Sequence, residues 1–166
     1  MTYSDLIKSY IHDLQKYTAE QLRFKFSEEV WSLGQMYDHM IAAALDYLDQ
    51  VEKCAYGGEK EQAVKTEAGE RLFALGSFPP VKIKLPDGPA NSPCNSDSKE
   101  ELARRLEHVL ERMQEWEKKL NRIHPDSKVR HGGFGWLNAR EWFELSGMHF
   151  RHHRAQQREL EQRLGL

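Results

Sequence analysis

The C-terminal part of the sequence carries two histidines whose spacing suits metal binding. His149 and His153 stand four residues apart in a segment with helical periodicity. Because a helix turns about 100° per residue, both side chains point close to the core direction set by Trp142 and Leu160. Their Cβ atoms would lie roughly 5–6 Å apart, so one metal ion could bind both imidazoles. A hydrogen-bonded pair in the core, or a partly exposed pair, would fit the same spacing.

A metal site of this kind needs a third ligand from another helix, and His39 is the natural candidate. On a helical wheel His39 lies about 110° from the centre of the apolar stripe of its own segment, on the flank beside Met36 and Asp46. A histidine in that position is often a surface group that covers the edge of an apolar face. Periodicity alone therefore leaves open whether His39 is a ligand.

We expect these histidines to lie on helices, because apolar residues recur at three- and four-residue spacing along most of the chain. Two N-terminal capping boxes mark helix starts, Ser98 with Glu101 and Asn138 with Glu141. No convincing strand is expected. The pattern predicts five helices, at Tyr3–Tyr17, from Ser32 to about Ala55, at Glu59–Leu75, from Ser98 to about Arg122, and from Asn138 to about Leu164.

Two segments lack helical periodicity. The stretch from Gly76 to Ser98 is proline-rich and reads as a long connecting loop, in which Val81–Leu85 alternates like a short edge strand. A second, glycine-rich loop contains His131-Gly-Gly-Phe-Gly135. The sequence therefore predicts an all-α fold, an antiparallel four-helix bundle with one additional short helix and long connecting loops.

Composition limits the possible classes of protein. The 166 residues fit a single domain over residues 1–166, and the net charge of −2 gives no basic footprint for nucleic acid or an anionic membrane. We expect no membrane span and no secretory signal, hence a cytoplasmic protein with reduced thiols. Cys54 and Cys94 share no motif with another cysteine or a histidine, so neither is expected to be catalytic.

Two motifs resemble those of the DinB-like (DinB/YfiT) superfamily. Residues 31–39 read W-S-L-G-Q-M-Y-D-H, similar to the W-S-x-x-Q-x-x-x-H opening of the family's second helix. Residues 131–142 and 149–156 resemble its C-terminal pattern H-P-x-F-G-x-L-x-x-x-E-W…H-x-x-H-H-x-x-Q. The DUF1569-type branch is the most similar, although Gly132 stands where proline is usual.

This resemblance implies an antiparallel four-helix core with a divalent metal ion in a pocket between helices. It also implies three histidine ligands, one from the second helix and two from the last, which correspond here to His39, His149 and His153. We expect zinc first and nickel second, since imidazole binds both. Gln156 could orient a ligand, and the roles of His131 and His152 stay open.

Three neutral imidazoles leave a coordination position for substrate, as in catalytic metal sites. The resemblance implies activation of a low-molecular-weight thiol, which attacks an electrophilic small molecule. A metal-dependent hydrolase and a non-catalytic metal-binding stress-response protein are the alternatives. The expected partners are thus a small-molecule substrate and a thiol, without nucleic acid or membrane, and a homodimer is compatible with a helical bundle.

Overall fold

The computed structural model describes residues 1–59, 63–79 and 92–166, and it consists mainly of helices. In these ranges the elements are α1 (Tyr3–Leu14), α2 (Ala19–Arg23), α3 (Leu33–Gly57), α4 (Glu67–Leu75), α5 (Lys99–Lys119), a short 3-10 turn (Leu120–Arg122), β1 (Lys128–His131), β2 (Gly135–Asn138) and α6 (Ala139–Leu164). The predicted all-α bundle is confirmed, with a small hairpin added to it.

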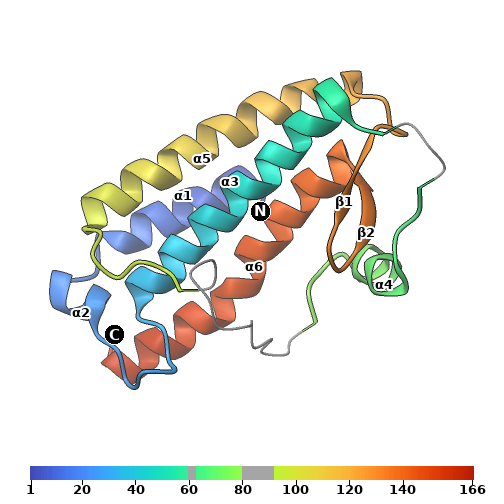
Figure 1. Ribbon diagram of the computed structural model, residues 1–166. Helices are drawn as coiled ribbons and strands as arrows, with labels where there is room; N and C mark the ends of the chain where they lie inside the picture. Colours follow the sequence, from blue (N-terminus) through green and yellow to red (C-terminus); the bar gives the residue numbers. More distant parts are fainter. Residues whose placement is uncertain (60–62, 80–91) are drawn as a thin grey trace.

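Four long helices form the core of the bundle (Figure 1). Helix α3 packs against both α5 and α6, while α1 packs against α5 and α6 from the other side. Their apolar faces meet in a single buried cluster that includes Leu14, Met40, Leu48, Leu106 and Leu145. Helix α3 therefore has two buried faces, because it packs against two long helices rather than one.

The helix starts follow from local capping. The side chains of Ser32, Ser98 and Asn138 each accept a hydrogen bond from the backbone N–H three residues later. The side chain of that later residue accepts one from the backbone N–H of the cap. These reciprocal bonds satisfy backbone donors that the first helical turn leaves unpaired. The predicted starts of α3, α5 and α6 are therefore confirmed.

Buried tyrosines fix α1 and α6 at the level of the histidine pair. The hydroxyl of Tyr10 donates to the carbonyl oxygen of Phe150 at 2.7 Å, and the hydroxyl of Tyr37 donates to the carbonyl oxygen of Tyr10 at 3.0 Å. Two turns beyond Phe150 on α6, the side-chain amide of Gln157 donates to the hydroxyl of Tyr17 at 2.8 Å. Because these bonds are buried, they set the depth of α6 against its neighbours.

The glycine-rich segment was expected to be a loop, but it forms an antiparallel hairpin. Strands β1 and β2 pair with Val129 opposite Leu137 and His131 opposite Gly135. Isolated bridges join Glu59 to β1 and Lys65 to β2. Strands of four residues are too short for their alternation to stand out in the sequence, and this pairing depends on residues far away in the chain.

Two helix predictions also need correction. The first helix ends at Leu14, since a separate short helix, α2, follows it. The third begins at Glu67 rather than Glu59, because Thr66 caps it and Lys65 pairs with the hairpin. The strand-like stretch Val81–Leu85 lies outside the described residues. In the described ranges, no helix is both long and apolar enough to cross a membrane.

Candidate metal centre

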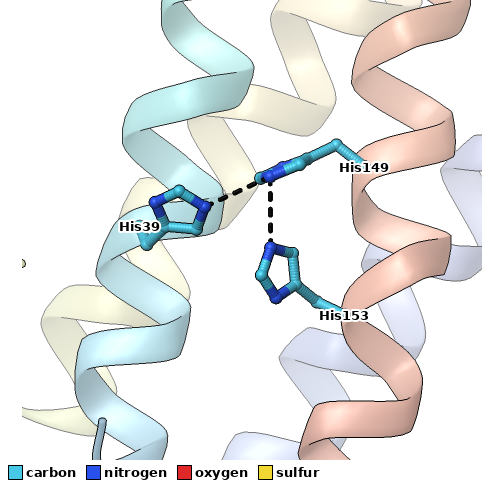
Figure 2. A group of neighbouring side chains, drawn as sticks. All are labelled: His39, His149 and His153. Carbon is cyan, nitrogen blue, oxygen red and sulfur yellow. Dashed lines mark hydrogen bonds between the residues drawn. The ribbon is translucent and has the colours of Figure 1, made fainter. Parts of the chain in front are cut away.

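Helices α3 and α6 bring the three predicted histidines together (Figure 2). The Nε2 atom of His149 lies 3.2 Å from Nε2 of His39 and 3.1 Å from Nε2 of His153. One ligand atom from each residue lies within 4.8 Å of the other two. His39 comes from α3, whereas the other two stand one turn apart on α6, so the cluster joins two helices of the bundle.

The spacing of these nitrogen atoms fits a divalent cation. Two imidazole nitrogens bound to one tetrahedral zinc ion at about 2.0–2.1 Å lie roughly 3.3 Å apart. The two shortest distances in the cluster are close to this value. Each nitrogen of a neutral imidazole carries either one proton or one lone pair. Nε2 of His149 therefore cannot form one full hydrogen bond to His39 and another to His153 at the same time. A cation would accept the lone pairs of all three.

All three imidazoles are held in the neutral form that binds metals. Burial lowers the pKa of His149 well below the ordinary value, and the adjacent His153 and His39 lower it further. Burial also lowers the pKa of His153 to about 4, against the opposing effect of its hydrogen bond to Gln156. The pKa of His39 is lowered by burial as well, although the charge of Asp38 opposes this. Near neutral pH, no proton has to leave before a metal binds.

Gln156 orients one of the three rings. Its Oε1 atom lies 2.7 Å from Nδ1 of His153. An amide oxygen can only accept a hydrogen bond, so the proton of a neutral His153 stands on Nδ1 and the lone pair on Nε2 faces the cluster. This contact between Gln156 and His153 supports the expectation that Gln156 orients a ligand.

The two other histidines of the C-terminal motifs lie outside the cluster. His152 packs its ring 5.5 Å from that of His153 and 5.6 Å from that of Phe78. His131 ends β1, where its Nδ1 atom accepts hydrogen bonds from the backbone N–H groups of Gly133 and Phe134. Two donors at Nδ1 leave the proton of His131 on Nε2, so this ring organises the hairpin turn.

The two cysteines stay apart from the cluster. Both are free thiols; Cys54 is buried and Cys94 is exposed. Burial raises the pKa of Cys54 to about 11, so its thiol stays protonated. The backbone N–H of Cys94 donates to the carboxylate of Asp38 at 2.8 Å, which ties the segment before α5 to α3. Neither thiol is bonded to an imidazole of the cluster in the described structure.

Sequence reasoning missed the aromatic rings beside the cluster. Trp31, Tyr47 and Phe78 contact its imidazoles. Tyr47 stands in a segment whose spacing indicates a helix but no site, and Phe78 lies in a segment without periodicity. Only Trp31 carried a signal, because it opens the motif that ends at His39.

The hairpin and α4 place Phe78 near α6. The backbone N–H of Thr66 donates to the carbonyl oxygen of Phe134 at 2.9 Å, and the ammonium of Lys65 pairs with the carboxylate of Glu141 at 2.5 Å. These contacts hold the start of α4 against the hairpin and the first turn of α6. The chain leaves α4 at Gly76, and Phe78 then reaches His149.

Comparisons with known proteins agree with this architecture. A family model for the DinB superfamily matches residues 6–157, which include α3, α5, the hairpin, most of α1 and α6, and all three histidines of the cluster. No curated protein matches the chain, and no solved structure does. DinB superfamily members bind metals in general, in accord with the cluster of three imidazoles. Because the match covers most of the sequence, this chain belongs to the DinB superfamily.

Proposed function

We propose that this protein binds one divalent metal ion through His39, His149 and His153 and uses it to activate a low-molecular-weight thiol for attack on an electrophilic small molecule. The observation that carries the proposal is the meeting of three neutral imidazoles, with ligand atoms within 4.8 Å of one another, between α3 and α6. A site with three histidine donors leaves a coordination position for an exogenous group.

When bound, a divalent cation supplies a positive charge that lowers the pKa of a coordinated thiol and so makes it nucleophilic at neutral pH. The residues of the chain do the rest. The three imidazoles keep their lone pairs free because burial disfavours protonation. Gln156 holds the His153 ring in the tautomer that presents Nε2. Burial raises the pKa of the protein's own thiol at Cys54 to about 11, so this thiol stays protonated at neutral pH and does not compete with the exogenous thiol for the metal.

Zinc is our first choice for the metal and nickel the second, because imidazole nitrogen binds both and zinc favours sites with few ligands. Within the superfamily, we assign the chain to the DUF1569-type branch on its motifs at residues 31–39 and 131–156. Both assignments are part of the proposal.

Metal content tests the site itself. Untagged wild-type protein, dialysed against zinc and then against metal-free buffer, should retain about one zinc ion per chain by mass spectrometry. The variant His39→Ala should retain far less, because only the α6 pair is left. His108→Ala, a change at an exposed histidine of α5, is the matched control and should retain as much as the wild type. Equal zinc in all three proteins would contradict the site.

Turnover tests the reaction. The zinc-loaded protein is incubated with a panel of low-molecular-weight thiols and an electrophile such as 1-chloro-2,4-dinitrobenzene, and thiol and electrophile are measured together. We expect both to disappear in equal amounts, and His149→Ala to abolish the effect. Disappearance of an ester or amide substrate without any thiol would favour the hydrolase instead. A protein that binds zinc but turns over neither would contradict both enzyme assignments.

A further inference from the structure

Aromatic rings from three separate segments contact the imidazoles of the candidate metal centre. The ring of Trp31, just before α3, has its centroid 4.8 Å from that of His39. Tyr47, two turns further along α3, lies edge-on to His149 at 5.9 Å. Phe78, beyond α4, lies at 5.9 Å from His149 on another segment. The immediate surroundings of the cluster are therefore largely aromatic.

These three rings differ from the aromatic residues of the core. Tyr10 and Tyr37, which fill the interior between the helices, have no exposed surface. Trp31, Tyr47 and Phe78 are each only half-buried. Part of each of these side chains is thus still accessible, and a half-buried ring offers a flat apolar surface on which another ring can stack. Tyr47 and Phe78 also pack against the core, so each ring has one covered side and some accessible surface next to the cluster.

The charged side chains of the described residues offer no unpaired cation at the cluster that would bind an anionic substrate. Among the described residues, Asp38 is the carboxylate whose charge acts on an imidazole of the cluster, where it raises the pKa of His39 against the larger effect of burial. Asp38 is itself paired with the guanidinium of Arg105 at 2.7 Å. The ammonium of Lys65, just before α4, is likewise paired, with the carboxylate of Glu141. In the part of the chain that the structure describes, no lysine or arginine bonds to the cluster.

We infer that the electrophile taken by this site is a neutral molecule with a flat aromatic body, which stacks among Trp31, Tyr47 and Phe78 while its reactive end faces the three imidazoles. This inference rests on the proposed metal site and narrows its substrate class. Pockets for small ligands are mostly apolar and aromatic, with few polar groups that fix orientation, and the histidine cluster is that polar group here.

Three hydroxamic acids serve as probes, because they share one metal-binding group and differ only in the body attached to it. Benzohydroxamic acid has a flat ring, cyclohexanecarbohydroxamic acid a bulky saturated ring, and acetohydroxamic acid only a methyl group. Each is titrated into cobalt-loaded protein, and the visible absorption of the cobalt ion reports binding. We expect benzohydroxamic acid to bind at least about tenfold more tightly than either of the others.

Paired variants locate the preference. Phe78→Leu keeps an apolar side chain but removes the ring beside His149, and it should reduce the preference for benzohydroxamic acid severalfold while the affinity for acetohydroxamic acid stays constant. Phe24→Leu changes a more exposed ring that packs on Phe26 instead, and it should leave all three affinities unchanged. Tyr47→Leu repeats the test in case Phe78→Leu binds cobalt poorly.

The outcomes separate this inference from the proposed function. Equal affinity for all three acids, or tighter binding of the cyclohexane compound, would overturn the aromatic substrate class while leaving the open metal site supported. If cobalt binds but none of the acids changes its absorption, the open coordination position is wrong, and the proposed function fails together with the inference. Retention of the full preference in both Phe78→Leu and Tyr47→Leu would also contradict the inference.

Discussion

His153 owes its orientation to a single neighbour on its own helix. Gln156 stands three residues later, and residues at this spacing face each other on a helix. Its Oε1 atom accepts a hydrogen bond from Nδ1 of His153, with 2.7 Å between the two atoms. The unprotonated Nε2 of His153 then faces His39 and His149. Groups that orient a ligand in this way commonly account for 10–100-fold of metal affinity.

Removal of this acceptor should weaken metal binding without unfolding the protein. We expect Gln156→Ala to lower zinc affinity about tenfold, because the His153 ring loses the contact that fixes its tautomer. Competition titration against a chromophoric chelator measures the affinity. Gln162→Ala, an exposed change two turns further along α6, is the control and should match the wild type. Equal affinities in all three proteins would remove Gln156 from the site.

At the scale of the element, the hairpin depends on close approach of backbones at Gly135. This residue has φ of +80°, a conformation that disfavours any side chain. A Cβ atom here would also lie 2.6 Å from the backbone nitrogen of Thr66 and 2.9 Å from the carbonyl oxygen of Val64. The glycine thus lets the segment before α4 pair with β2.

A matched pair of glycine variants tests this role. Gly135→Ala should lower the free energy of unfolding by at least about 2 kcal/mol, because strain in the backbone adds to the clash with residues 64–66. Gly132→Ala lies in the same hairpin, has open space around it and no positive φ, and should change stability by less than about 0.5 kcal/mol. Urea unfolding of the chelated proteins provides both values. Comparable losses in the two variants would contradict the assigned role of Gly135.

At the scale of the whole molecule, unfolding exposes imidazoles that the bundle keeps neutral. His153 is 8% exposed, and its pKa is lowered from 6.5 to about 4 by burial. The unfolded chain therefore binds a proton at this residue at a higher pH than the folded chain does. Its contribution to stability is fully present above about pH 6.5 and is lost progressively as the pH falls towards 4.

The metal-free protein should accordingly be less stable in mild acid. From His153 alone, the free energy of unfolding should fall by about 2 kcal/mol between pH 7.5 and pH 5, and His149 should add to this loss because its pKa is also lowered. Urea unfolding of the chelated protein at both pH values measures it. The variant His153→Gln should show a smaller difference, whereas His108→Gln should keep it. An unchanged difference in His153→Gln would contradict the burial effect.

Much of the helical architecture follows from the sequence by itself. Apolar spacing and capping residues are local signals, and they located the starts of α3, α5 and α6 at Ser32, Ser98 and Asn138. The pairing of His149 with His153 is local too, because four residues on one helix fix both direction and distance. The motifs at residues 31–39 and 131–156 also identified the superfamily before any geometry was known.

The tertiary structure alone decided where His39 points and how the hairpin forms. A helical wheel averages the apolar residues into one stripe, but α3 packs on both α5 and α6, so its flank at His39 faces α6 and meets His149. The strands at 128–131 and 135–138 pair with each other and with residues 59 and 65. Strands this short have no residue pattern from which these contacts could be predicted. In both cases the deciding interaction joins residues far apart in the chain. Local periodicity depends only on neighbouring residues, so it cannot predict which distant segments come into contact.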